Sequence, residues 1–136
     1  MTTIPLKQQI INRLLADATL SGVLGDGGES IYPQAGQHPD QDSATPFLVL
    51  RIGAETPTSN LTARQFLTFW VYDNPLQGYW DVDAIIARLR SRLDGYEFAY
   101  DGRYWLRCEY DGASEEQTDE AWNKAMKFVR FSIPRV

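Results

Sequence analysis

The chain has 136 residues, of which 43% are hydrophobic and 23% are charged, and its formal net charge is −5. This length is typical of one domain, and this composition is typical of a folded chain rather than a disordered one. The surplus of acid argues against a protein that holds nucleic acid, because neutralising phosphates requires an excess of Lys and Arg. The sequence therefore predicts a single domain spanning residues 1–136.

Simple counts argue against two further classes of protein. The only cysteine, Cys108, cannot form a disulfide bond within the chain. The first residues, Met1–Pro5, lack the basic region and apolar stretch of a signal peptide. No run of about 20 apolar residues is present that would cross a membrane as a helix. We therefore expect a chain that is made in a cytoplasm and has no membrane partner.

The first third of the chain is predicted to hold one helix and a long loop. Apolar residues recur every four positions over Leu6–Ala18, which is the spacing of one helix face, and Thr3 can cap this helix. Asp26–Pro46 is rich in Gly and Pro and is predicted to be mostly loop, with a short strand at Ile31–Tyr32.

Two strands and a second helix follow. Branched and aromatic residues make Phe47–Ile52 a predicted buried strand, Gly53–Asn60 is a polar connection, and Leu61–Tyr72 alternates as a longer strand does. Asn74-Pro75 is a capping residue followed by proline, which predicts the start of a helix. An apolar stripe then continues to Leu93, where Asp94-Gly95 is predicted to end the helix.

The last part of the chain is predicted to be a hairpin and a final strand. Asp101-Gly102 between the strand-like runs 96–100 and 103–110 is a strong hairpin signal. Residues 111–120 are polar and carry five acids, and Ala121–Ile133 returns to alternation until Pro134 ends it. This order of elements predicts an α+β fold: an antiparallel or mixed sheet of about five strands, with two main helices packed on one face.

None of the polar clusters has the pattern of a catalytic or metal site. The only histidine, His38, is predicted to lie in a loop without a nucleophile motif, and Cys108 is expected to be a buried strand residue. Asp81 and Asp83 diverge by about 200° on a helix, so they cannot share a metal ion. The basic run Arg88–Arg92 is interpreted as a solvated helix face rather than a DNA contact. We expect no enzyme activity, no catalytic residue, no cofactor and no metal.

Aromatic residues on the second face of the predicted sheet exceed what a solvated face requires. Phe66, Trp70 and Tyr72 lie opposite the more apolar face of their strand, and Trp105 occupies a similar position in the hairpin. A face that helices leave uncovered should be mostly polar, and Trp and Tyr are common anchors at protein interfaces. Two interpretations stay open: these four residues form a subunit or partner interface, or their face packs on long loops of the same chain.

Several segments carry a resemblance to a known family: residues 14–20 (LLADATL), 31–33 (IYP), 45–50 (TPFLVL), 69–72 (FWVY), the helix 85–93 with its Asp-Gly ending, and 128–131 (FVRF). With these segments the chain resembles the tail terminator or tail completion proteins of long-tailed, non-contractile phages (siphophages) and of related gene-transfer particles. The resemblance covers nearly the whole chain and lies in the order of elements and turns rather than in signature residues.

The resemblance implies an assembly role in the virion. It implies a homo-oligomeric ring, usually of six copies, that caps the tail tube, stops its polymerisation and joins it to the head. The implied partners are the tail tube protein, a head–tail connector or head-closure protein, and double-stranded DNA that passes through without specific binding. No catalytic residue is implied.

Two acidic segments, both predicted to be loops, suggest how DNA could pass through such a ring. Asp40 and Asp42 belong to the first segment, and Glu115, Glu116 and Asp119 belong to the second. An acidic wall would repel DNA phosphates and let the duplex slide rather than stick. We therefore hypothesise that these residues line the DNA channel.

Two alternatives to a tail terminator remain open. The first is a head-closure or head–tail connector protein of the neck, which would differ in its position within the particle. The second is a small intracellular ligand-binding α+β module, which predicts a monomer or dimer with an enclosed apolar pocket.

Overall fold

The structure is a computed structural model that describes residues 5–25, 30–33, 45–57, 63–100, 104–120 and 123–135. Its helices are α1 (Leu6–Leu15), α2 (Ala18–Val23) and α3 (Trp80–Leu93), and a 3-10 turn, η2 (Pro75–Gln77), precedes α3. The strands are β1 (Ile31–Pro33), β2 (Phe47–Pro57), β3 (Ala63–Asp73), β4 (Glu97–Tyr100), β5 (Tyr104–Arg107), β6 (Glu109–Ala113), β7 (Gln117–Asp119) and β8 (Lys124–Arg135).

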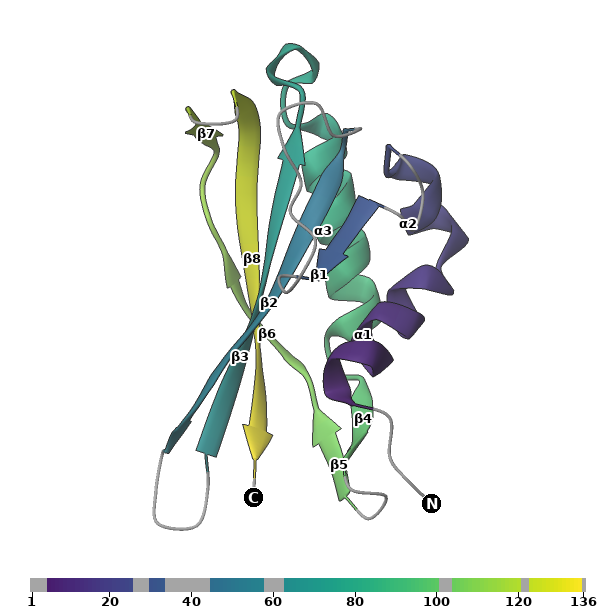
Figure 1. Cartoon of the computed structure of the whole chain (residues 1–136), viewed down its shortest axis with the longest axis vertical. Coiled ribbons are helices and arrows are strands. Elements are labelled where there is room, and N and C mark those ends of the chain that lie inside the picture. Colours follow the sequence, from purple (N-terminus) through teal and green to yellow (C-terminus); the bar gives the residue numbers. More distant parts are fainter. Residues whose placement is uncertain are drawn as a thin grey trace.

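Six of these strands form one mixed sheet. Its order is β1-β2-β3-β8-β6, and β7 pairs with a separate stretch of β8. Only β1 runs parallel to its neighbour, and the other pairs are antiparallel. The helices α1, α2 and α3 all lie on the same side of this sheet (Figure 1), and β4 and β5 form a separate two-stranded hairpin. The predicted α+β fold with a mixed sheet and helices on one face is confirmed.

The core lies between the helices and the sheet. The predicted apolar stripe of α3 is buried, with Ile85 and Leu89 fully inaccessible to solvent. On the facing strands, Phe69 and Phe131 meet edge to face with ring centroids 6.0 Å apart. Full burial of one such side chain stabilises a fold by about 1.5–3 kcal/mol. The three helices cover only this face of the sheet (Figure 1), so the side chains of the opposite face do not pack against them.

The opening helix is broken where the sequence predicts one continuous helix. The α1 helix ends at Leu15, and Asp17 becomes the N-cap of α2, where its Oδ1 accepts a hydrogen bond from the Thr19 backbone N–H at 3.1 Å. A carboxylate that caps a new helix start outweighs continuation of the old helix. The predicted cap Thr3 lies outside the described residues, and Pro5 stands at the N-cap of α1.

The second helix also begins later than predicted. Asn74 does cap a helical turn, because its Oδ1 accepts from the Leu76 N–H at 2.9 Å, but that turn is η2. Gly78 then adopts a φ of 67°, a left-handed conformation that a continuing helix cannot contain, and α3 starts at Trp80. The predicted end is confirmed, since Gly95 after α3 has a φ of 79°.

The strands extend beyond their predicted limits. The strand β2 continues to Pro57 through the expected connection 53–60, with a register shift between Ile52 and Glu55 in its pairing with β3. The strand β8 continues past Pro134 to Arg135. Both β2 and β8 pair with the central strand β3. These pairings explain the extension, because the pairing context of a strand can outweigh its local propensity.

The acidic segment 111–120, which we expected to be a loop, lies along an edge of the sheet. Tyr110 pairs with Phe131 and Thr118 pairs with Ala125, so β6 and β7 follow the same partner, β8. Between them the Ser114 N–H donates to the Phe128 carbonyl at 2.8 Å, and Ser114 Oγ accepts from the Phe128 N–H at 2.9 Å. Charged side chains suit an edge strand, which explains why a polar sequence is extended here.

The hairpin β4–β5 is confirmed, although its turn Asp101-Gly102 lies outside the described residues. The second predicted strand of the hairpin, 103–110, is divided at Cys108. Residues before Cys108 belong to the hairpin, whereas Glu109 opens β6 in the main sheet. One segment thus passes from the small sheet to the large one.

Candidate interaction surfaces

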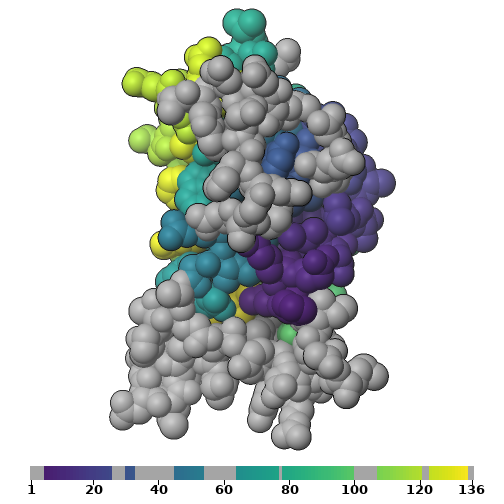
Figure 2. Space-filling model, viewed as in Figure 1, coloured from purple at the N-terminus to yellow at the C-terminus, as the bar shows by residue number. Residues whose placement is uncertain are grey.

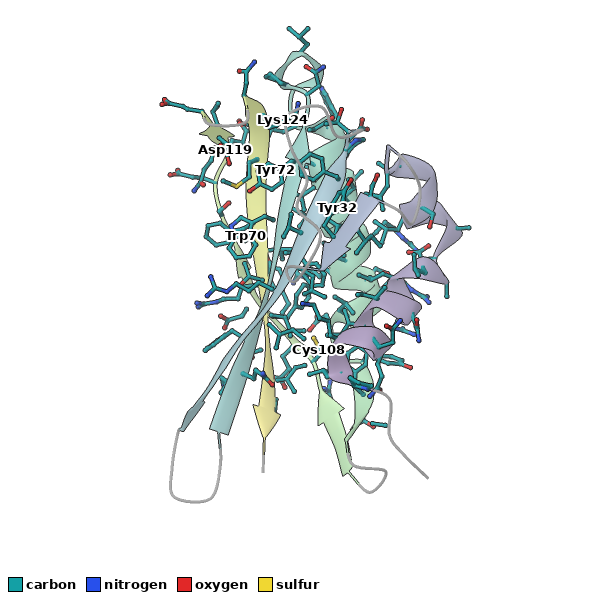
Figure 3. All side chains as sticks on the ribbon, viewed as in Figure 1. Tyr32, Trp70, Tyr72, Cys108, Asp119 and Lys124 are labelled. Carbon is teal, nitrogen blue, oxygen red and sulfur yellow. The ribbon has the colours of Figure 1, made fainter. Side chains whose placement is uncertain are left out.

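The sheet face that points away from the helices carries an aromatic strip. Trp70 pairs with Val49 on one side and Phe128 on the other, and Figure 3 shows its side chain directed away from the helices. Phe66 shares this face by alternation, and both Phe66 and Trp70 are partly buried. The strip therefore keeps some accessible aromatic surface, and the interface role of these two residues stays a prediction.

Charged groups border this strip. The Arg130 guanidinium lies 4.5 Å from the centre of the Phe66 ring, and Arg130 Nε donates to Asp111 Oδ2 at 2.7 Å. Arg64 donates to Ser132 Oγ at 3.0 Å on the same face. An aromatic centre with a charged and polar rim is the usual composition of a protein interface.

Tyr72 differs from Phe66 and Trp70, because its side chain is 7% exposed within the single chain. Its ring stacks on Phe47 with centroids 4.9 Å apart, and Phe47 meets Tyr32 edge to face at 5.7 Å. Burial, and secondarily the charge of Asp119, raises the pKa of Tyr72 to about 12. Tyr72 thus has a packing role within the chain, and its part in an interface stays a prediction.

Trp105 lies in another sheet. Its backbone is in β5, opposite Ala99 of β4, whereas Trp70 is in the main sheet. The four predicted interface residues therefore do not all belong to one β-sheet. The interface role of Trp105 stays a prediction.

The described acids of the predicted channel set come from one stretch of chain. Glu115 and Glu116 are exposed between β6 and β7, and Asp119 is partly buried in β7, near Tyr72 (Figure 3). Because Asp119 belongs to a strand, the second acidic segment is not wholly a loop. Asp40 and Asp42 lie outside the described residues, so their place in the channel stays a prediction from the sequence.

The sequence interpretation missed an apolar tip before α3, made of Leu76 and Trp80. Leu76 is 90% exposed and Trp80 is 85% exposed. Figure 2 shows this part of the chain, coloured teal, projecting at the top of the molecule. A signal was present for Trp80, because it lies about 200° around the helix from the buried Val82. A tryptophan on that side of α3 must face solvent or a partner.

The interpretation also missed a pocket at the opposite end of α3. This arginine pocket has a volume of about 310 Å³ and is lined by Gln9, Asn12, Arg13, Ala16, Arg92, Tyr96 and Phe98. Arg13 Nε donates to the Arg92 carbonyl at 2.6 Å, and its guanidinium lies 3.5 Å from the centre of the Tyr96 ring. No local signal could reveal the pocket, since its residues come from α1, α3 and the hairpin.

A buried carboxylate, Asp17, forms an ion pair beside the arginine pocket. Arg88 Nη2 is 2.8 Å from Asp17 Oδ2, while Arg92 Nε is 4.0 Å from the same oxygen. Burial alone would raise the pKa of Asp17, but the hydrogen bond and charge of Arg88 and two backbone N–H groups outweigh it and hold the pKa below 3.8. Arg92 Nε is buried and has no hydrogen-bond partner within the described structure.

Metal-binding clusters and membrane-spanning helices are both absent from the described part of the chain. No cluster of three His, Cys, Asp or Glu side chains there could hold a metal ion, and none of its helices is long and apolar enough to span a membrane. Cys108 is fully buried, as predicted, and burial raises the pKa of its thiol to about 12. His38 lies outside the described residues.

Comparisons with known proteins place the fold. No family model and no curated protein matches the sequence. Among solved structures, the chain is similar to a chain from the virion of a native gene transfer agent (GTA) particle, with a TM-score of 0.71 and 18% identity, over 96% of this chain and 93% of that one. A second solved structure matches with a TM-score of 0.55 and 11% identity, over 97% of both chains. At these identities the likeness shows a shared fold.

Proposed function

We propose that the chain is a structural protein of a phage-like virion, and more narrowly a tail terminator: a subunit of a ring, usually six-membered, that caps the tail tube and joins it to the head. The observation that carries the proposal is the fold shared with a chain of a gene transfer agent virion over nearly the full length of both chains. The family resemblance in the sequence supports the narrower role.

The aromatic strip supports an assembly role. Phe66 and Trp70 keep accessible surface on a sheet face bordered by Arg130 and Arg64, and such surfaces provide interface anchors. In this proposal the strip contacts a neighbouring subunit or the tail tube protein. Trp105 and Tyr72 are proposed to contribute to the same or a neighbouring contact.

The acidic residues support a path for DNA. Glu115 and Glu116 are exposed on one connection, and the chain as a whole has a charge of −5. If these residues, with Asp119, Asp40 and Asp42, face the lumen of the ring, they would repel DNA phosphates. The DNA would then pass without sequence-specific binding. Replacing Glu115 and Glu116 by glutamine should then increase retention of double-stranded DNA by assembled rings. Unchanged retention would remove these two residues from the lumen.

The experiment that tests the function is removal of the chain from its particle. A terminator's loss should give tails of uncontrolled length that carry no heads. The shared fold is also compatible with a head-closure or connector protein of the neck. Loss of such a protein would instead leave tails of normal length and heads that lose their DNA. Tail lengths measured on electron micrographs separate the two roles, and particles indistinguishable from wild type would contradict both.

A matched pair of variants tests the aromatic strip. Trp70→Ala should impair assembly on the tail tube more than it reduces the free energy of unfolding, whereas Trp70→Phe keeps an aromatic ring and should retain assembly. Unfolding and tube capping are measured on the same preparations. Equal loss of both properties in Trp70→Ala would assign Trp70 to the core.

A further inference from the structure

The two ends of α3 present opposite surfaces. At its start stands the apolar tip, Leu76 and Trp80, whose side chains are almost fully exposed. At its finish lies the arginine pocket of about 310 Å³, with Arg92, Arg13 and Tyr96 in its wall. The 14 residues of α3 separate the two surfaces by roughly 20 Å, because a helix rises about 1.5 Å per residue. The tip therefore cannot fill the pocket of its own chain.

The tip has the composition of an interface anchor. Tryptophan is enriched among the residues that dominate binding energy, and Leu76 and Trp80, four positions apart in the chain, both offer exposed apolar surface. The tip is bordered by acid, since Asp81 and Asp83 follow Trp80 in the first turn of α3. Lys127 Nζ engages Asp83 at 2.6 Å, while Asp81 remains partly exposed beside the tip.

The pocket has the complementary chemistry. Aromatic rings of Tyr96 and Phe98 meet edge to face at 4.8 Å and provide apolar wall. Arg92 Nε is buried 4.0 Å from Asp17, which Arg88 engages at 2.8 Å, while 31% of the Arg92 side chain is exposed to the pocket's surroundings. An indole ring is the aromatic group that guanidinium binds best, and the exposed part of the Arg92 guanidinium can donate hydrogen bonds to a further carboxylate.

We propose that Leu76 and Trp80 of one copy dock into the arginine pocket of a second copy, with Asp81 placed toward Arg92. Because the two surfaces differ, the contact is heterologous: each subunit offers a tip to one neighbour and a pocket to the other, and successive contacts build a ring or an open chain. This inference deepens the proposed function and rests on it only for closure into a ring.

Cysteine cross-linking tests the contact directly. Leu76→Cys and Ala16→Cys chains are prepared separately, mixed at about 1 mM, where even a weak contact is populated, and oxidised. The contact predicts a cross-link between the two different variants. Thr118→Cys, exposed on β7, replaces Leu76→Cys in the control mixture and should give little product. The proposal is overturned if the control cross-links equally, or if Leu76→Cys chains link mainly to one another.

A charge exchange tests the pairing at the rim. Asp81→Arg alone and Arg92→Asp alone should each lower the cross-link yield by about tenfold, and a mixture that meets one exchanged tip with one exchanged pocket should recover it. Unfolding curves show whether each variant folds. If both singles fold and associate as wild type does, or if the exchanged mixture recovers nothing, Asp81 does not face Arg92.

One variant separates failure of this contact from failure of the proposed function. Trp80→Ala removes a side chain that is 85% exposed, so a Leu76→Cys chain that also carries it should fold and yet lose the cross-link to Ala16→Cys chains. If Trp80→Ala still caps tail tubes as wild type does, the contact is wrong and the proposed function stands. If Leu76→Cys and Ala16→Cys chains cross-link as expected but removal of the protein leaves tail lengths unchanged, the contact stands and the proposed function is wrong.

Discussion

Two buried aspartates near the opposite ends of α3 have pKa values shifted in opposite directions. Asp17, beside the arginine pocket, is paired with Arg88 and caps α2, and its pKa is lowered from 3.8. Asp73, which ends β3 before the apolar tip, is 1% exposed, and burial raises its pKa despite the Asn74 N–H that donates to Oδ1 at 2.7 Å. Its Oδ2 has no hydrogen-bond partner within the described structure.

The difference shows that pairing, rather than burial, decides whether a buried carboxylate stabilises the fold. A paired and hydrogen-bonded charge can recover the cost of leaving water, whereas a half-satisfied one keeps that cost. The pocket end is thus consolidated by the Asp17–Arg88 pair, although Arg92 Nε there has no hydrogen-bond partner within the described structure. The tip end leaves both a carboxylate oxygen and an apolar surface unsatisfied.

The largest expected effect is at the paired aspartate. Asp17→Ala removes the cap of α2 and the partner of Arg88, and should lower the free energy of unfolding by about 2 kcal/mol in urea titrations. Asp17→Asn keeps a capping oxygen and should cost less. A loss below about 0.5 kcal/mol in both variants would contradict the comparison, because the Asp17–Arg88 pair would then contribute no measurable stability.

Acid should remove the same contribution in the wild-type chain. Because the folded pKa of Asp17 lies below its unfolded value near 3.8, its stabilisation is fully present above pH 3.8 and is lost as the pH falls through the folded pKa. The slope from this one group is at most about 1.4 kcal/mol per pH unit. Urea titrations between pH 5 and pH 2 on wild type and Asp17→Asn isolate it, and identical curves would contradict the assignment.

Tyr96 at the pocket end should contribute a moderate amount. Its ring contacts the Arg13 guanidinium at 3.5 Å and the Phe98 ring at 4.8 Å, although 37% of it is exposed. Tyr96→Ala should lower the free energy of unfolding by about 1 kcal/mol. Tyr96→Phe retains the ring and serves as the control, so an equal loss in both would point to the hydroxyl instead.

The unpaired aspartate should show the opposite sign. The raised folded pKa of Asp73 means that stability falls as the pH rises from 3.8 through that folded pKa, since the fold disfavours the ionised form. Asp73→Asn should therefore stabilise the chain by about 0.5 kcal/mol at pH 7, and the gain should vanish at pH 3. Destabilisation at pH 7 would mean that the charge at this position is useful.

The smallest expected effect is at the tip itself. Trp80→Ala should change the free energy of unfolding by less than about 0.5 kcal/mol, because the side chain buries little surface within the chain. Thermal unfolding beside Tyr96→Ala compares one aromatic truncation at each end of α3. A loss at Trp80 as large as that at Tyr96 would remove the contrast between the ends.

Local patterns predicted the elements whose causes are local. The stripe of α3, the end at Gly95 and the β4–β5 hairpin follow from spacing and turn residues, and all three are present. The pairing of Asp17 with Arg88, which lies 71 positions away, and the edge strands β6 and β7, which pair with β8, have distant causes. Contacts of this range leave no periodic trace in a single sequence.

The same limit applies to the surfaces. Alternation placed Phe66, Trp70 and Tyr72 on one face, but it could not show that Phe47 stacks on Tyr72 and closes it off. Trp80 was recognisable from its angle on α3. The arginine pocket was not, because Arg13, Arg92 and Tyr96 become neighbours only when α1, α3 and the hairpin pack.

The buried thiol has a practical consequence for following assembly. Cys108 is fully inaccessible, and burial, with the charges of Asp94 and Glu109, holds its pKa near 12, so at neutral pH it offers maleimides almost no thiolate. The native chain should therefore stay unlabelled and can serve as the negative control in labelling experiments. A cysteine introduced at an exposed position should take one fluorophore per subunit, which allows energy transfer between neighbours to report spacing while a complex forms.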